Sequence, residues 1–308
     1  MRRLVISPIV VLACALVAVP PKTAAQTPAT ASERQILVTV LDKSGAVVQD
    51  LTASDVVVRE DGEARTVTAA TLATDPMWIS LIVDMAKEAR GTDATRPDLI
   101  KALTSFVSSV QSNSEGSGIS LTECAGAAVV QVDFTTNTGA LRSAIQHLAY
   151  GPQPETVMLE AIVDSSKRLS RVSSPRRVIV ALDFVSSVEG SDVLPLKVGE
   201  AVHSAGASLW ALSVQRSFSS IGAVGLLGVD ARPPDSRHSV LALVPDATGG
   251  QHLNVFGTLL LEATLLKLAD ILTHQYLVSY VRPDARPVSS ITASSPRGDK
   301  ALVAPLVR

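Results

Sequence analysis

The side chains that could carry out catalysis are few and scattered in this sequence. A hydrolase nucleophile would stand in a Gly-x-Ser-x-Gly elbow, and no such motif is present. The histidines lack the spacing that metal ligands on one helix or strand would have, so we interpret each as a solvated or hydrogen-bonded residue rather than a catalyst. These histidines are His147, His203, His238, His252 and His274.

Nucleotide chemistry is excluded by the turn that follows the first buried strand. Residues 79–83 read as that strand, and residues 84–89 after it read Asp-Met-Ala-Lys-Glu-Ala. A dinucleotide-binding protein would have Gly-x-Gly-x-x-Gly at this place, with the pyrophosphate on the following helix. The phosphate loop Gly-x-x-x-x-Gly-Lys is absent as well. We therefore predict that the chain is not an enzyme.

The amino terminus has the layout of a secretory signal. Arg2 and Arg3 precede an apolar run over residues 4–19, which is too short for a membrane-spanning helix. We expect cleavage before Gln26, which makes residues 1–25 a signal peptide and leaves an exported chain with no membrane span. An alternative takes residues 11–14 as a lipobox, which would anchor the protein through a lipidated Cys14.

The charge balance excludes one class of partner, and the cysteine content indicates how reactive the mature chain's thiol is. Removal of residues 1–25 takes away Arg2, Arg3 and Lys22, so that 27 basic and 29 acidic residues become 24 and 29, a net charge of −5. This balance, with aromatic residues at 3%, excludes a nucleic-acid partner, which would need a basic patch and stacking platforms. The mature chain keeps only Cys124, which lies in an apolar stretch and predicts a buried, unreactive thiol.

The two ends of the mature chain predict β structure. Residues 26–34 are rich in Thr, Ala, Pro and Ser and predict a linker, whereas residues 35–75 alternate with period two. So few strands cannot bury both faces of a sheet, so we expect a partner in the β-like residues 283–308. Together the two segments would form a small β unit, into which the rest of the chain is inserted. Its first strands are expected at 36–41, 56–60 and 66–68, the last two joined by a turn at Asp61 and Gly62.

Residues 76–282 alternate between short apolar strands and helix-period segments. This pattern predicts an α/β domain with a doubly wound, mostly parallel sheet and one antiparallel edge. A stretch rich in Ser, Gly, Arg and Pro over residues 215–237 predicts a long surface loop. Strands are expected at 79–83, 119–124, 128–132, 178–182, 209–212 and 275–280, and helices after Pro97, around Leu141, around Ile162, before Gly206 and over 259–273.

Several of these residues carry a resemblance to a known family. The strands at 81–84 and 178–183 each end in an acid, and Thr156 is followed by Ala161 five residues later, which resembles the von Willebrand factor A fold. The motifs at 51–55, 60–62, 248–250 and 275–280 resemble the exported von Willebrand factor A-related proteins that are common in Acidobacteria. The resemblance implies a von Willebrand factor A-like, Rossmann-like α/β fold over residues 76–282, and it says more about fold than about function.

The resemblance also implies a metal-ion-dependent adhesion site at the carboxyl ends of the strands. In this family an Asp-x-Ser-x-Ser loop, a Thr and a distant Asp hold a hard cation that binds a carboxylate of the partner. Asp84 matches the first acid, Thr156 the threonine and Asp183 the distant acid, but Ala86 and Glu88 stand in the places of the two serines.

The substitution by Glu88 changes the charge that the family's site presents. A divalent ion between Asp84 and Asp183 gives a roughly neutral site, whereas a third carboxylate makes the site negative and repels an acidic partner. We therefore expect a degenerate site that binds no metal, or else one that holds Mg²⁺ or Ca²⁺ weakly through Asp84, Glu88, Thr156 and Asp183.

These observations predict an exported protein-binding module of the adhesion or scaffold kind, with a protein partner and no catalysis. A structural component of the cell envelope is an alternative, and a periplasmic enzyme is a third. The sequence does not distinguish a periplasmic from an extracellular location, and it gives no oligomeric state.

Overall fold

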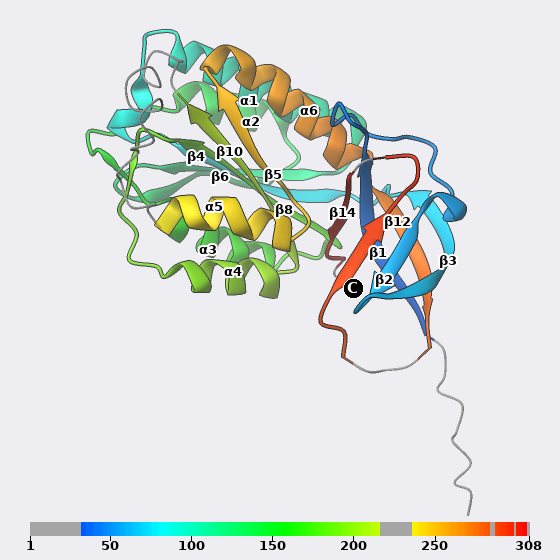
Figure 1. The fold of residues 1–308 in the computed structure, drawn as a ribbon. Helices are drawn as coiled ribbons and strands as arrows, with labels where there is room; N and C mark the ends of the chain where they lie inside the picture. The colour runs from blue at the N-terminus through cyan, green and yellow to red at the C-terminus, as the bar shows by residue number, and fades with distance from the viewer. Residues whose placement is uncertain (1–31, 216–235, 284–286, 299, 307–308) are drawn as a thin grey trace, which may run out of the picture.

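The computed structural model describes residues 32–215, 236–283, 287–298 and 300–306. The predicted signal peptide, and most of the loop predicted at 215–237, lie outside these residues. The described chain forms two six-stranded sheets that occupy opposite ends of the molecule (Figure 1).

The larger part is an α/β unit around a mostly parallel sheet. The strand order is β11-β10-β8-β4-β5-β6, with parallel pairing throughout except between β5 and β6 at one edge. The predicted α/β class is thereby confirmed. The strands are β4 (Met77–Asp84), β5 (Gly118–Cys124), β6 (Ala128–Thr135), β8 (Arg176–Phe184), β10 (Ala207–Gln215) and β11 (His252–Phe256).

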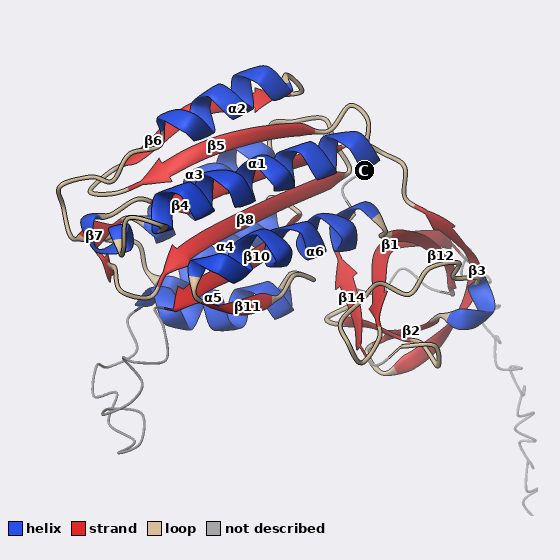
Figure 2. Cartoon of the chain, turned by 90° about the horizontal axis from the view of Figure 1, so that it is seen from above, coloured by secondary structure: helices blue, strands red, loops and turns tan. Residues whose placement is uncertain are grey.

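Helices cover both faces of this sheet, as a doubly wound fold requires (Figures 1 and 2). One face packs against α1 (Thr95–Asn113), α2 (Thr138–His147) and α6 (Leu261–Thr273). The other face packs against α3 (Met158–Leu169), α4 (Pro195–Ser204) and α5 (Ser236–Ala247). Central strands such as β8 are buried along their length, which explains why they read as continuous apolar runs.

Strand β11 and helix α5 of the α/β unit were not expected from the sequence. Strand β11 is only five residues long, and the polar residues His252 and Asn254 leave it without a clear run of apolar residues. Helix α5 carries Pro245 inside it and begins at Ser236, so the predicted surface loop extends too far at its end. Arg237, assigned to that loop, lies in α5 with only 3% of its surface exposed. Burial against β10 and α4 outweighs the weak helix signal of this segment.

The second sheet combines both ends of the chain. Its order is β13-β2-β3-β12-β1-β14, and β1 (Ser32–Leu41) lies between β12 (Tyr276–Arg282) and β14 (Lys300–Ala304). The pairing of β1 with β14 joins residues more than 250 positions apart. The remaining strands are β2 (Val57–Glu60), β3 (Glu63–Leu72) and β13 (Ile291–Ser294).

Two segments lie elsewhere than the sequence indicated. Strand β12, placed at the end of the α/β domain at 76–282, belongs to the second sheet and pairs with β1 and β3. Its alternating apolar residues suit an antiparallel sheet with one covered face better than a buried parallel sheet. Residues 32–34, assigned to the linker, belong to β1, because they pair with the end of β12 at Arg282 and its neighbours.

A buried charge cluster holds three strands of the second sheet together. The Glu60 carboxylate is 1% exposed and lies 2.9 Å from Arg65 Nε and 3.7 Å from Arg282 Nε. The Tyr280 hydroxyl donates to the other carboxylate oxygen of Glu60 at 2.8 Å. Burial and this hydrogen bond raise the pKa of Tyr280, so the phenol remains a donor at neutral pH. Glu60 thus connects β2, β3 and β12.

We expect Glu60→Gln to lower the free energy of unfolding by about 3 kcal/mol, because two guanidinium groups lose their buried counter-charge. Urea denaturation followed by circular dichroism measures this difference. Glu63→Gln is the matched control, since Glu63 pairs with the same Arg65 but is 68% exposed, and it should change stability little. Equal effects of the two substitutions would contradict the role given to burial.

Candidate functional site

The two aspartates that the sequence singled out lie at the carboxyl edge of the parallel sheet. Asp84 ends β4 and is 0% exposed, and Asp183 near the end of β8 is 4% exposed. Asp84 accepts the Ala86 backbone N–H at 3.0 Å and the Phe184 backbone N–H at 3.2 Å, one on each oxygen. Because Phe184 follows Asp183 directly, this second bond fixes the ends of β4 and β8 side by side.

A buried arginine forms an ion pair with Asp183. Arg237 Nε lies 3.1 Å from Asp183 Oδ1, and the exposed fractions of the two side chains are 4% and 5%. Arg237 also donates from Nη2 to the Ser187 carbonyl at 2.7 Å. Its position in the first turn of α5 directs the guanidinium toward the strand ends. The edge therefore contains a fixed positive charge that the sequence analysis had placed on the surface.

The charges at this edge influence one another. Burial raises the pKa of Asp84, and the N–H bonds and the positive charge of Arg237 offset part of that effect. The pKa of Glu189 is raised in the same way by burial and is lowered in part by Arg237. Arg237 is therefore the common counter-charge of Asp84, Asp183 and Glu189.

Thr156 and Glu88 reach the same edge by different routes. Thr156 lies in the short strand β7 (Glu155–Thr156), which pairs with β9 (Val188–Glu189), and it is completely buried. Its hydroxyl oxygen has no hydrogen-bond partner among the described residues. Glu88 lies in the short helix Lys87–Arg90, where its side chain is half-buried and its backbone carbonyl accepts a bond of 2.8 Å from Ser186 Oγ. All four predicted positions thus belong to strand ends and loops that meet at one edge.

A serine and a histidine extend this edge toward β11. Ser213 Oγ donates to Asp183 Oδ2 at 3.0 Å and lies 2.9 Å from His252 Nε2. A serine hydroxyl has one proton, so His252 Nε2 must be the donor in the second bond. In a catalytic triad the histidine lies between serine and aspartate and takes the serine proton. Here the serine lies in the middle, so this arrangement does not activate it.

Sequence reasoning missed Arg237, Ser213, His252 and Glu189. Each lies far along the chain from Asp84 or in a segment without periodic pattern. The fold brings the rings of His252 and His238 to a centroid distance of 6.5 Å, a pairing that sequence spacing does not indicate. Burial and the nearby His238 lower the pKa of His252 and keep it neutral.

The remaining candidates add no chemistry. Cys124 is fully buried, and burial raises the pKa of its thiol well above its ordinary value, as expected of an unreactive cysteine. Among the residues described, no three His, Cys, Asp or Glu side chains are grouped closely enough to hold a metal ion. No helix within the described ranges is both long and apolar enough to cross a membrane.

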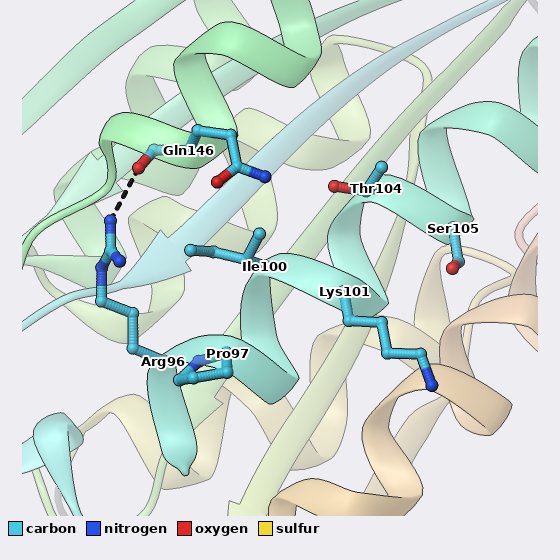
Figure 3. Close-up of a pocket in the computed structure, with 7 residues that line it drawn as sticks. All are labelled: Arg96, Pro97, Ile100, Lys101, Thr104, Ser105 and Gln146. Atoms are coloured by element: carbon cyan, nitrogen blue, oxygen red, sulfur yellow. Dashed lines mark hydrogen bonds between the residues drawn. The ribbon is translucent and has the colours of Figure 1, made fainter. Parts of the chain in front are cut away.

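A hollow of about 490 Å³ lies away from this edge, on the outer surface of α1 and α2 (Figure 3). Its two cationic side chains are already bound within the chain. Arg96 donates to the backbone carbonyl of Gln146 at 2.6 Å, and Lys101 extends toward α6, where it pairs with Glu262 at 2.7 Å. None of the predicted site residues lines this hollow.

Comparisons with known proteins give similarity at the level of structure. No family model matches the sequence, and no curated protein matches it. The chain is similar to the von Willebrand factor domain of the type V pili tip protein Mfa5 from Porphyromonas gingivalis, with a TM-score of 0.46 and 11% identity over 64% of this chain and 95% of that one. It is also similar to a von Willebrand factor type A protein from Catenulispora acidiphila, with a TM-score of 0.47 and 9% identity over 92% and 75% of the two chains.

A third similar structure is the proximal thread matrix protein 1 of the mussel byssus, with a zinc-occupied metal-ion-dependent adhesion motif. Its TM-score is 0.44, and its identity is 11% over 71% of this chain. The chain spans about half the length of that protein, 50%.

Proposed function

We propose that this chain is an exported protein-binding module, of the adhesion or scaffold kind, without catalytic activity. One observation carries the proposal: the polar groups at the carboxyl edge of the sheet are buried and bound to one another. Asp84, Asp183 and Arg237 are each less than 5% exposed and pair within the chain. In open α/β sheets this edge is where ligands bind. Because the polar groups at this edge are buried and paired, they are not available to a substrate. We therefore place the binding of a partner on the outer surface of the protein.

The proposal includes the finer expectations from the sequence. Residues 1–25 are removed on export and the mature chain begins at Gln26, with anchoring through Cys14 as the alternative. Asp84, Glu88, Thr156 and Asp183 are the remains of a metal-ion-dependent adhesion site that no longer recruits a partner's carboxylate. The chain divides into an α/β domain and a β unit built from residues 35–75 and 283–308, to which we add β12.

Exposed leucines on one helical face support binding to a protein. Leu194 and Leu196 at the start of α4 are 67% and 72% exposed, and Leu243 on the adjacent helix α5 is 71% exposed. Large apolar side chains that remain in water on neighbouring helices are typical of surfaces that a partner covers. We assign the partner-binding surface to these three leucines.

We expect the immobilised mature chain to retain a protein from the envelope fraction of its own source, equally in EDTA and in Mg²⁺. Substitution of all three leucines by serine should weaken the purified complex by at least about tenfold, because each buried leucine contributes about 1.5–3 kcal/mol. Isothermal titration calorimetry measures the dissociation constant. The matched control is Leu259→Ser, a leucine 84% exposed beside α6 on the opposite helical face, which should bind normally.

Two outcomes would oppose the proposal. One is a mature chain that shows no saturable, stoichiometric binding to any retained protein. The other is binding that depends on Mg²⁺ and survives the leucine substitutions, because the partner would then bind at the carboxyl edge of the sheet and not at the leucines.

A further inference from the structure

The buried edge at the strand ends requires a positive charge. Asp84 and Asp183 place two buried carboxyl groups at this edge, with the half-buried Glu189 nearby, and isolated carboxylates in such a buried region are strongly unfavourable. In an occupied metal-ion-dependent adhesion site, a divalent cation supplies this charge. In this chain a side chain is already in place to do so.

Arg237 is held in this position by two independent contacts. Its Nε pairs with Asp183 Oδ1 at 3.1 Å, and its Nη2 donates to the Ser187 carbonyl at 2.7 Å, on the loop that joins β8 to β9. The guanidinium is charged at every physiological pH and belongs to the same chain, so its local concentration far exceeds that of a dissolved ion. Buried contacts from α5 to β10 keep the helix that carries it in place.

The residues around Arg237 fit a metal ion poorly. Ala86, which is completely buried, gives no side-chain oxygen in the loop. Asp183 has one oxygen in the ion pair with Arg237 and the other in the bond from Ser213. Thr156 Oγ1 is the one feature that suits a ligand, because it is buried and unpartnered among the described residues. One hydroxyl does not offset the repulsion between a divalent cation and a guanidinium on the same carboxylate.

We infer that Arg237 takes the place of the metal ion in this site, so that the carboxyl edge is neutralised by the chain itself and binds no divalent cation. The site is then a permanent structural ion pair. Removal of the guanidinium charge should reopen it, because Asp84, Asp183 and Thr156 would remain as oxygen ligands facing an unbalanced negative charge.

The test uses Mn²⁺, which prefers oxygen ligands as Mg²⁺ does and whose paramagnetic resonance signal reports the free ion. The wild-type chain should leave millimolar Mn²⁺ free. Arg237→Gln removes the charge and keeps an amide donor, and it should bind one ion at least about tenfold more tightly than the wild type. Arg237→Lys restores a positive charge and should again leave the ion free.

Thermal unfolding gives a second readout. Mg²⁺ should raise the melting temperature of Arg237→Gln relative to EDTA and leave that of the wild type unchanged. The matched control is Arg176→Gln, another buried arginine, whose partners are carbonyl and amide oxygens rather than carboxylates. It should lower the melting temperature without any response to the ion.

Two results would overturn the inference: saturable Mn²⁺ binding by the wild type, or a folded Arg237→Gln chain that binds no better than the wild type. If Arg237→Gln does not fold in EDTA, its refolding in Mg²⁺ or Mn²⁺ decides the question. Recovery with either ion supports the inference, and failure with both opposes it.

Discussion

Gly250→Ala is expected to prevent this protein from folding to its native structure. A Cβ atom at Gly250 would overlap the backbone carbonyl oxygen of Leu209 and lie 2.6 Å from its carbonyl carbon. Leu209 lies within the buried strand β10, where it pairs with Ile179 of β8 and its N–H donates to Thr248 Oγ1 at 3.1 Å, so that backbone has no room to move. We expect a loss of more than about 4 kcal/mol in the free energy of unfolding, in the range of the most severe single substitutions.

Gly249→Ala should be comparably severe, since its Cβ would lie 2.5 Å from Ala304 Cα in β14 and its φ is +77°. Gly62→Ala is the matched control. Gly62 has a φ of +86°, and a Cβ at this position would meet nothing within 4 Å, so only backbone strain of about 1 kcal/mol should result. Soluble yield and urea denaturation measure all three variants. A Gly250→Ala chain as stable as Gly62→Ala would refute the close approach.

Arg176→Ala is expected to lower the free energy of unfolding by at least about 3 kcal/mol. Arg176 is 1% exposed and donates to four acceptors: Ala73 O at 3.0 Å, Asp75 O at 2.8 Å, Leu272 O at 2.6 Å and Gln275 Oε1 at 3.1 Å. Ala73 and Asp75 lie on the link between β3 and β4, and Leu272 and Gln275 lie where α6 ends and the chain enters β12. The two sheets join at these two places. Burial lowers the pKa of Arg176 to about 10, so it is still charged at neutral pH.

The neighbouring Arg177 provides the control for this prediction. It donates to two carbonyls, Ala205 O at 2.9 Å and Val172 O at 2.8 Å, within the α/β unit and closer to the surface. Arg177→Ala should cost less than half as much as Arg176→Ala. Urea denaturation followed by circular dichroism gives both values. If the two substitutions cost the same, Arg176 has no special role at the junction.

The motifs that carry the resemblance to von Willebrand factor A-related proteins have structural roles in this chain. Gly249 and Gly250 permit the close approach to β14 and β10. Asp55 caps its own turn through Thr52 and pairs with Arg297 at 3.4 Å, which ties the amino-terminal segment to the carboxyl-terminal one. Gln275 accepts from Arg176. The motifs at Gly249, Gly250 and Gln275 therefore contribute to the junction of the two sheets, and the motif at Asp55 ties together the two ends of the chain.

The sequence alone determined the elements whose signal is local. Periodic burial along α1 and continuous apolar runs in β4 and β8 were readable, because a helix or a buried central strand has its own repeat. The turn at Asp61 and Gly62 was readable for a similar reason, since both residues adopt positive φ there. Asp84 and Asp183 were identified as acids at strand ends, and parallel strands bring such ends to one edge.

Only the tertiary structure decided which partners these elements meet. Strand β12 has the same apolar alternation in either sheet, so its pairing with β1 and β3 depends on residues more than 200 positions away. Arg237 follows a segment without period and lies 54 residues after Asp183, and nothing in that spacing indicates their ion pair. Local pattern reports whether a side chain is buried, whereas the neutralisation of a buried charge depends on a counter-charge that folding brings from another element.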